Sequence, residues 1–369
     1  KAFMRPSRSE TSVREAIPLI AGNFFHHPSR LLKMAGVTGT NGKTTITYIL
    51  ESIIRSAGKE PGVIGTINYR YKDTVMPAKN TTPGPVELQS ILCDMVRAGV
   101  DYAVMEVSSH ALDQRRVDNV WFDAAICTNI TADHLDYHET MARYIAAKAK
   151  LFAHLKDAGT AILNVDDIRV AALLENVGSR QVLTYGIRNA AAVRAKEIRL
   201  SLAGSSFIVT TPQASFDVRT GLVGMHNVSN ILAAVAAALA LKININAIKR
   251  GIERAAAVPG RLERVEAGQP YKVFVDYAHT EDALYNILTL LRQVREKRII
   301  TVFGCGGNRD TTKRPKMGKV VCELSDEAII TSDNPRFEEP GAIIRDIEHG
   351  VKGAFTNYRI VEDRRAAIE

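Results

Sequence analysis

A glycine-rich stretch at residues 36–45 carries the side chains with the clearest chemistry in this chain. Small residues surround three glycines, and Lys43, Thr44 and Thr45 follow the third of them. Such a stretch lets backbone N–H groups close around phosphate oxygens, and a helix that begins there adds partial positive charge. Lys43 is placed to reach the outer phosphates, and the Thr44 hydroxyl is placed to bind Mg²⁺. The stretch therefore predicts a site for a nucleoside triphosphate and magnesium.

The spacing of this loop departs from the common phosphate-loop pattern GxxxxGK[ST]. That pattern requires a glycine five residues before Gly42, where the chain has Val37. A glycine-rich turn that only starts a helix would account for the glycines. It would not account for a lysine and two threonines at the positions that phosphate chemistry needs, so we interpret the stretch as a variant phosphate loop.

Carboxylates and histidines follow two apolar runs further along the chain. Glu106 closes one run and precedes Ser108-Ser-His110, and Asp133-His-Leu-Asp-Tyr-His138 follows the next run. An α/β sheet binds its ligands at the carboxyl ends of its strands, and Mg²⁺ prefers such oxygen ligands. A solvated turn is the alternative for Glu106. The second cluster is either a metal or acid–base site or a hydrogen-bonded loop.

Three further polar clusters follow three apolar runs in the last third of the chain. They are Asp276-Tyr-Ala-His279, Gly304-Cys-Gly-Gly-Asn-Arg-Asp310 and Asp333-Asn-Pro-Arg336. If the runs are successive strands, the clusters line one edge of a sheet, where a second substrate would bind. Arg309 and Arg336 are each able to hold a carboxylate through two parallel N–H bonds. Taken singly, each cluster is also compatible with a turn.

Lys148 gives no such signal from its position. It lies in the helical pattern 141–155, on the same face as Tyr144 four residues earlier. A lysine in a helix is normally a solvated charge, and the pattern alone predicts that here.

Alternating apolar runs and helical patterns must position these groups, and they indicate an α/β chain with a parallel, doubly wound sheet. The stretch 197–223 has short alternating runs and predicts an antiparallel addition. Up to the breakers Pro259 and Gly260, strands are expected at 32–37, 102–107, 124–128 and 160–164, and helices at 44–57, 86–97, 141–155 and 227–241. After them, strands are expected at 273–277, 298–303 and 328–332, and helices at 283–294, 316–324 and 341–350.

Composition bounds the class of protein. The 369 residues suggest two or three domains, and the formal charge of +8 suits anionic ligands such as nucleotides. Aromatic residues make up only 6%, and no dense run of Lys and Arg stands out, so nucleic-acid binding is weakly supported. The four cysteines form no CxxC pair, and no signal peptide or membrane span is visible in the sequence. These features predict a cytoplasmic protein with reduced thiols.

Taken together and in order, the motifs resemble those of the Mur ligases, the ATP-dependent amide-forming enzymes of peptidoglycan synthesis. Two of them, Asn80-Thr-Thr-Pro83 and Asp333-Asn-Pro-Arg336, are similar to motifs of the branch that adds the diamino acid, the second selecting meso-diaminopimelate over L-lysine. The remaining motifs are Gly39–Thr45, Met105–His110, Asp133–His138, Tyr144–Lys148, Gly224–Asn230, Pro259–Arg261 and Asp276–His279.

The resemblance implies a role for each matched residue, including a carbamylated lysine (N6-carboxylysine) at Lys148, which reverses the expectation of a solvated charge. ATP is expected at Gly39, Thr40, Asn41, Gly42, Lys43, Thr44, Thr45, His226, Asn230, Arg261 and Asp276. Catalysis is expected from Lys43, Glu106, His134 and Lys148, and metal ligation from Thr44, Glu106, His134 and Lys148. The muramoyl peptide is expected at Asn80, Thr81, Thr82, Ser108, Gln114 and Arg116, and diaminopimelate at Arg309, Asp333, Asn334, Pro335 and Arg336.

The resemblance also implies the architecture and the reaction. A central phosphate-loop ATPase-like domain with a parallel sheet (33–257) would precede a Rossmann-like α/β C-terminal domain (258–369), with residues 1–32 ending a uridine-binding domain and its linker. The substrates would be UDP-N-acetylmuramoyl-L-alanyl-D-glutamate and meso-diaminopimelate, with ATP and Mg²⁺ as cofactors. We expect a monomer that acts in cell-wall biogenesis, and through it in cell shape and division, without nucleic acid or membrane insertion.

Two departures and several alternatives stand beside this interpretation. Position 1 is Lys, and residues 362–369 read as a helix that has just begun, so we expect a chain trimmed at both ends with an incomplete C-terminal domain. Thr280-Glu281 stands where the family more often has Thr-Pro. A ligase resembling folylpolyglutamate synthase, a non-catalytic ATP-binding module and a nucleic-acid-binding protein are the alternatives.

Overall fold

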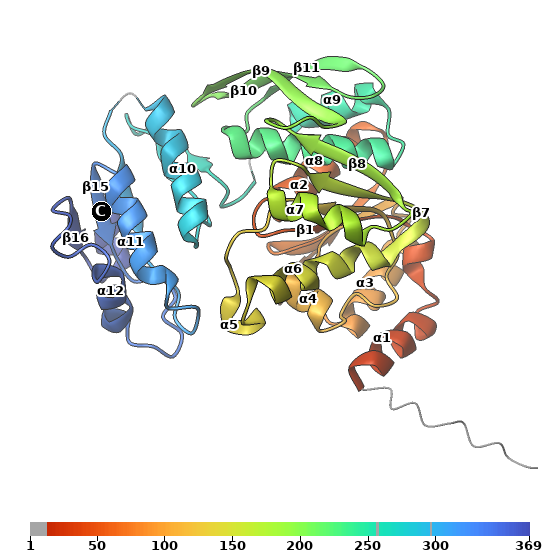
Figure 1. Cartoon of the computed structure of the whole chain (residues 1–369), viewed down its shortest axis with the longest axis horizontal. Helices are drawn as coiled ribbons and strands as arrows, with labels where there is room; N and C mark the ends of the chain where they lie inside the picture. Colours follow the sequence, from red (N-terminus) through yellow and green to blue (C-terminus); the bar gives the residue numbers. More distant parts are fainter. Residues whose placement is uncertain (1–12, 256–257, 296) are drawn as a thin grey trace, which may run out of the picture.

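The computed structural model describes residues 13–255, 258–295 and 297–369, which form a large body and a smaller C-terminal one (Figure 1). An eleven-stranded sheet organises the large body, and sheets of two and three strands organise the smaller one. Of the expected N-terminal segment 1–32, residues 1–12 lie outside the described part of the chain. Helix α1 (Val13–Phe24) begins the described chain and packs against α3 (Pro85–Arg97).

The large sheet is parallel in its middle and antiparallel at both ends, in the order β11-β10-β9-β8-β7-β6-β1-β5-β2-β3-β4. Both the parallel sheet and the antiparallel addition after residue 197 are therefore confirmed. The strands are β1 (Lys33–Thr38), β2 (Pro61–Ile64), β3 (Asn68–Tyr71), β4 (Thr74–Pro77), β5 (Tyr102–Glu106), β6 (Phe122–Cys127), β7 (Leu155–Asn164), β8 (Gln181–Gly186), β9 (Val193–Ser201), β10 (Gly204–Thr210) and β11 (Ser215–Thr220).

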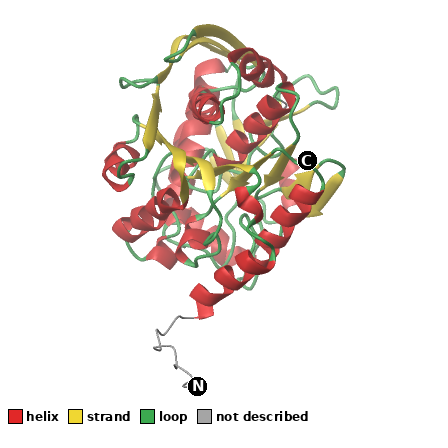
Figure 2. Cartoon of the chain, turned by 90° about the vertical axis from the view of Figure 1, so that its right-hand side faces the viewer, coloured by secondary structure: helices red, strands yellow, loops and turns green. Residues whose placement is uncertain are grey.

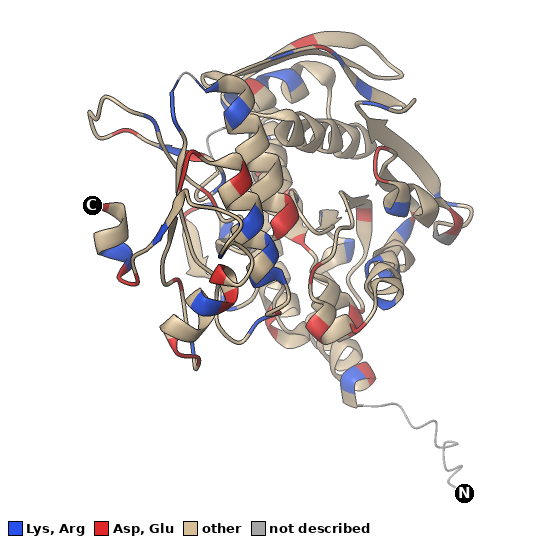
Figure 3. Cartoon of the chain, turned by 60° about the vertical axis from the view of Figure 1, so that its left-hand side comes forward, with Lys and Arg blue, Asp and Glu red and all other residues tan. Residues whose placement is uncertain are grey.

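Helices cover both faces of this curved sheet, as the turned view shows (Figure 2). Basic and acidic residues are interspersed along both bodies (Figure 3). Among the described residues, no helix is long and apolar enough to cross a membrane. The remaining helices of the large body are α2 (Lys43–Ser56), α4 (Ser109–Asp113), α5 (Leu135–His138), α6 (Met141–Ala149), α7 (Ile168–Ala171), α8 (Met225–Ala240) and α9 (Ile245–Arg254), with short 3₁₀ turns at Pro28–Arg30, Lys150–His154 and Ala172–Asn176.

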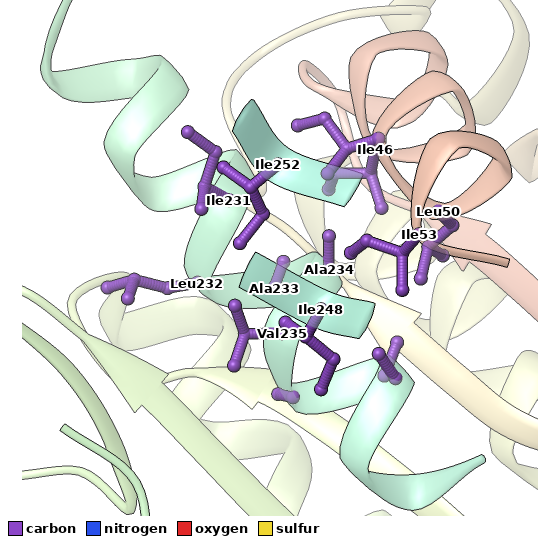
Figure 4. Packing of buried hydrophobic residues seen from close by; sticks show 14 of the residues in the cluster. Ile46, Leu50, Ile53, Ile231, Leu232, Ala233, Ala234, Val235, Ile248 and Ile252 are labelled. Atoms are coloured by element: carbon purple, nitrogen blue, oxygen red, sulfur yellow. The ribbon is translucent and has the colours of Figure 1, made fainter. Parts of the chain in front are cut away.

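The core on one face of the sheet is formed by α2, α8 and α9 (Figure 4). Ile46, Leu50 and Ile53 recur on one side of α2, as the helical period requires, and they are fully buried against the alanine-rich α8. Gly251 of α9 lies so close to the backbone of Ile53 that a Cβ atom would overlap it. This packing fixes α2, whose first residue is Lys43 of the predicted phosphate loop.

The C-terminal body repeats the strand–helix alternation on a smaller scale. Three parallel strands form its main sheet in the order β14-β15-β16, and a separate antiparallel pair is formed by β12 and β13. Its elements are β12 (Glu263–Val265), β13 (Val273–Val275), α10 (Glu281–Val294), β14 (Ile300–Phe303), α11 (Lys313–Leu324), β15 (Glu327–Ile330), α12 (Pro340–Glu348), β16 (Tyr358–Ile360) and α13 (Arg364–Ile368).

Two expectations need correction. The helix predicted at 141–155 ends at Ala149, because the chain continues as a 3₁₀ turn and Leu155 begins β7 beside β6. The clusters after β13, β14 and β15 do not share one sheet edge, since β13 pairs only with β12. The Asp276–His279 cluster therefore has a different position from the other two.

Replacing Gly251 by alanine should destabilise the large body by about 1–3 kcal/mol, because the added methyl group overlaps Ile53 in a packed core. The measurement is the thermal unfolding midpoint by circular dichroism. Gly221→Ala is the matched control, since a Cβ atom there meets nothing within 4 Å. Equal midpoints for the two variants would contradict the proposed contact.

Candidate active site

The glycine-rich loop joins β1 to α2, and two of its glycines have no possible replacement in this conformation. Gly39 has φ 138° and Gly42 has φ 90°, backbone angles that other residues rarely adopt. A Cβ atom at Gly39 would overlap the Thr128 hydroxyl, and one at Gly42 would overlap the Asn230 amide. The loop is therefore packed tightly between the end of β6 and the start of α8.

Lys43 folds back over this loop. Its Nζ donates to the carbonyl oxygens of Gly39 and Thr40 at 2.9 Å each. Burial is the main cause that lowers the pKa of Lys43, with Glu106 and Asp133 acting in the opposite direction. An ammonium bonds more strongly to a phosphate oxygen than to a neutral carbonyl, so this side chain is held next to the position where phosphates would bind.

Glu106 lies at the carboxyl end of β5, directly beside the loop. Its side chain is only 1% exposed, so the alternative of a solvated turn is wrong. The carboxylate accepts hydrogen bonds from the Thr44 hydroxyl at 3.0 Å and from the Thr66 N–H and hydroxyl at 2.8 and 3.0 Å. The Arg261 Nη2 reaches the same Thr44 hydroxyl at 3.4 Å from the other body. A threonine hydroxyl next to a buried carboxylate fits Mg²⁺, which takes few protein ligands and completes its shell with phosphates and water.

Lys148 is the second lysine of the site, and unlike Lys43 it is fully buried. It is 2% exposed, and its Nζ donates to the Gly39 carbonyl at 2.9 Å and lies 4.4 Å from the centre of the Tyr144 ring. The solvated charge predicted from position alone is therefore wrong. Burial, with a smaller contribution from the charge of Lys43, lowers the pKa of Lys148 to about 7. Burial therefore favours the neutral form of this amine.

The cluster 133–138 forms a hydrogen-bonded loop whose rings contact their neighbours edge to face or at a tilt. His134 has φ 55° and its Nε2 lies 3.4 Å from the Asp133 carboxylate. Its ring centre is 4.7 Å from that of His110, and His138 Nε2 lies 3.0 Å from the Ser109 hydroxyl. Burial lowers the pKa of His134, which keeps the imidazole neutral and able to bind a cation. Among the described residues, no three His, Cys, Asp or Glu side chains form a ready metal site.

Most of the residues matched to a muramoyl-peptide site lie in one hydrogen-bonded layer behind Glu106. The Thr82 hydroxyl donates to the Glu106 carbonyl at 2.9 Å and accepts from the Ser108 N–H at 3.1 Å. Arg116 donates to the Thr82 carbonyl at 3.1 Å and to the Gln114 amide oxygen at 3.0 Å. The Thr81 hydroxyl is 3.1 Å from that of Thr66, whereas the Asn80 side chain is exposed beyond this layer.

A pocket between the two bodies completes the site. It is lined by the loop and the start of α8 on one side and by residues 276–279 and α10 on the other. His226, which burial keeps neutral by lowering its pKa to about 4, and Asn230 both line it. Asp276 accepts N–H bonds from Leu262 and Ala278 at 2.6 and 2.7 Å, and residues 276–279 line this pocket opposite the phosphate loop.

Asp282 belongs to this site but was not predicted. Its Oδ2 accepts a hydrogen bond from the Asn41 amide at 3.1 Å, a direct contact between α10 and the phosphate loop. An aspartate in the first turn of a helix interacts favourably with the helix dipole. Asp282 therefore has an ordinary structural explanation, and the sequence gives no sign of a role in the site. Only the arrangement of the two bodies identifies it as part of the site.

The loops after β14 and β15 contact each other. The Arg336 Nη1 donates to the Gly307 carbonyl at 2.6 Å, and the Gly307 N–H donates to the Asn334 carbonyl at 2.9 Å. Asp333 pairs with Arg364 at 3.3 Å. Burial is the main cause that lowers the pKa of His110, and the charges of Arg116 and Arg309 lower it further.

Comparison with known proteins agrees with this arrangement. A profile of the Mur ligase middle domain matches residues 37–238, and a profile of the Mur ligase glutamate ligase domain matches residues 260–369. The chain is 46% identical over 361 residues to the UDP-N-acetylmuramoyl-L-alanyl-D-glutamate–2,6-diaminopimelate ligase of Bacillus licheniformis, an alignment that covers 96% of this chain and 73% of that protein.

Solved structures show the same relationship. One titled as a UDP-N-acetylmuramoyl-L-alanyl-D-glutamate–2,6-diaminopimelate ligase has 34% identity and a TM-score of 0.67, and the match covers 91% of this chain and 69% of that one. The folylpolyglutamate synthase of Mycobacterium tuberculosis has a TM-score of 0.79 at 18% identity, with 96% and 86% of the two chains covered. At that identity the second likeness shows a common fold alone.

Replacing Gly42 by alanine should weaken the binding of a non-hydrolysable ATP analogue roughly tenfold or more, because φ 90° and the contact with Asn230 both oppose a side chain. Isothermal titration calorimetry measures the affinity. Gly58→Ala is the control, since Gly58 also has positive φ and ends the same helix but has open space around it. Unchanged affinity in the Gly42 variant would exclude this loop as the phosphate site.

Proposed function

The chain belongs to the Mur ligase family, a family of ATP-dependent ligases, and we propose that it joins meso-diaminopimelate to the D-glutamyl residue of UDP-N-acetylmuramoyl-L-alanyl-D-glutamate. The observation that carries the proposal is the pocket that the two bodies form together. The large body lines it with the phosphate-loop residues Asn41, Gly42 and Thr45, and the C-terminal body lines it with Arg261 and residues 276–279. One copy of the chain supplies all of these residues, so a monomer is sufficient.

The proposed reaction has two steps. The γ-carboxylate of the D-glutamyl residue attacks the terminal phosphorus of ATP, which gives an acyl phosphate and ADP. The amine of diaminopimelate then attacks the acyl carbon, and phosphate leaves as the amide forms. The first step brings two anions together, and in the second step negative charge leaves with the phosphate while the amine gives up a proton. The loop N–H groups, Lys43 and Arg261 would therefore serve mainly to offset negative charge.

The residues around Thr44 are suited to hold magnesium. Thr44 and Glu106 would bind the cation together with ATP oxygens, since their oxygens already lie 3.0 Å apart and are shielded from water. Bound there, Mg²⁺ would neutralise charge on the transferred phosphate. A second cation would be held by His134 and by Lys148 after carbamylation.

The electrostatics around Gly39 favour carbamylation of Lys148. Two ammonium groups, those of Lys43 and Lys148, donate to the same buried carbonyl oxygen, and each disfavours the charge of the other. With its pKa lowered to about 7, Lys148 presents a neutral amine whose lone pair can attack CO₂. The resulting carbamate is an anion, which replaces repulsion from Lys43 by attraction and supplies an oxygen ligand for a cation.

Arg336 is proposed to select the amino acid. One of its terminal nitrogens bonds to the Gly307 carbonyl, which fixes the guanidinium group while the side chain remains exposed. A carboxylate at the distal end of diaminopimelate would pair with the remaining N–H groups. L-lysine has no carboxylate there and would leave this charge unpaired.

The alternative functions predict different results in a phosphate-release assay. A ligase resembling folylpolyglutamate synthase would share the fold without a role for the Asp333–Arg336 loop. A non-catalytic ATP-binding module would release no phosphate in response to an acceptor. The interspersed charges along both bodies give no reason to favour nucleic acid (Figure 3). Phosphate release measured with the UDP-linked dipeptide, with and without diaminopimelate, separates these cases, because only the proposed ligase requires both.

Replacing Lys148 by alanine should abolish phosphate release, and short-chain carboxylic acids should restore part of it by supplying the missing carboxylate. In the chain without substitutions, the ¹³C NMR signal of the Lys148 carbamate at fixed dissolved CO₂ should grow as the pH rises through about 7, because the neutral amine is the reactive form. Lys150→Ala, which removes an exposed lysine paired with Asp113, is the control and should remain active. Full activity of the Lys148 variant would refute its role.

Replacing Arg336 by alanine should remove about 2–4 kcal/mol of preference for diaminopimelate over L-lysine, the value of a charge-assisted pair. The preference is measured as the ratio of kcat/KM for the two amino acids. Arg359→Ala, at an exposed ion pair on β16, should leave the ratio unchanged. An unchanged ratio in the Arg336 variant would show that another residue selects the amino acid.

A further inference from the structure

A buried guanidinium lies beneath the two loops assigned to the diamino acid, and no role in the reaction has been given to it. Arg314, at the start of α11, is 1% exposed and is one of the largest fully buried side chains in the described chain. Its Nη1 and Nη2 donate to the two carboxylate oxygens of Glu338 at 2.9 Å each. Nη1 also donates to Asp346 of α12 at 2.8 Å.

The partners of Arg314 belong to both loops. Glu338 follows the Asp333–Arg336 loop by two residues, and Arg314 Nη2 also points to the carbonyl of Gly306 in the other loop at 3.4 Å. The carboxylate of Glu338 in turn accepts the N–H of Asn308, the residue before Arg309. Arg314 and Glu338 together therefore connect the backbone next to Arg309 with the backbone next to Arg336.

Direct contacts between the loops complete this connection. The Phe337 N–H donates to the Asn308 side-chain oxygen at 3.0 Å, and Arg336 bonds to the Gly307 carbonyl. Gly307 lies so close to the Pro335 carbonyl that a Cβ atom there would overlap it. The two loops thus form one rigid unit, and its only fully buried charge is Arg314 among the residues that the structure describes.

We propose that Arg314 is a positioning residue that fixes the spacing between Arg309 and Arg336 and so sets the selectivity for an amino acid with two distant carboxylates. The proposal rests on the proposed function. Arginine suits this position because its planar group makes parallel bonds to Glu338 and still reaches a third partner. A lysine would carry the same charge but could not make the two parallel bonds to Glu338.

A positioning role and a purely stabilising role of Arg314 predict different results, because its two carboxylate partners lie in different parts of the C-terminal body. Glu338 leads to the loops, whereas Asp346 lies in the last turn of α12. If Arg314 only stabilises the domain, loss of either carboxylate lowers the unfolding midpoint and neither changes amino-acid selection. If Arg314 positions the loops, only the loss at Glu338 changes selection.

The experiment compares Arg314→Lys, Glu338→Gln and Asp346→Asn with the unmodified chain in the phosphate-release assay. We expect KM for diaminopimelate to rise about tenfold in Arg314→Lys and Glu338→Gln, because small displacements of binding groups weaken substrate binding. The preference for diaminopimelate over L-lysine should fall in the same two variants. KM for ATP should stay within about twofold in all three, and Asp346→Asn should match the unmodified chain. Unfolding midpoints are recorded for every variant.

The outcomes separate the two proposals. If the unmodified chain shows no release dependent on diaminopimelate, the proposed function fails. If it does, but Glu338→Gln selects as the unmodified chain does, or Asp346→Asn loses selection equally, the positioning role is wrong. Should Arg314→Lys not fold, Glu338→Gln decides alone, because Glu338 is partly exposed and the variant keeps the size of the side chain.

Discussion

The carbonyl oxygen of Gly39 accepts hydrogen bonds from two lysines, and the charge balance of the site depends on this convergence. Lys148 is buried and Lys43 is half-buried, and Glu106 and Asp133 offset part of their charge. Cationic groups with little access to water favour a ligand that carries several negative charges. A nucleoside triphosphate beside a carboxylate substrate meets this requirement, and the modification proposed at Lys148 adjusts it.

Much of the fold follows from local sequence patterns. The apolar period of α2, the glycines before it and the breakers at 259–260 are local features, and the elements built on them lie where they were expected. The end of α6 was misplaced because residues 150–154 keep a helical pattern while Leu155 is drawn into the sheet by pairing with β6. The position of β13 was not predicted because it pairs with β12, a short strand that the sequence pattern did not indicate, in a sheet separate from β14–β16.

Site residues that belong to a recognisable sequence motif could be predicted. Residues that join the site only through contacts between distant elements could not. The phosphate loop and Glu106 are of the first kind. Lys148 is buried because Gly39 lies above one face of α6. The position of Lys148 in a helix predicted a solvated charge, and only the resemblance implied that Lys148 belongs to the site. Asp282 and Arg314 are of the second kind, since each looks like an ordinary charged residue at the start of a helix until its partner in another element is known.

The close contact of Gly251 with Ile53 has a mechanical consequence. Because α2 begins at the phosphate loop and α9 precedes the C-terminal body in the chain, this contact links the loop to the last helix before that body. A displacement of the loop by an arriving nucleotide would therefore also act on α9. Any movement of the second body relative to the loop would change the contact between Asn41 and Asp282.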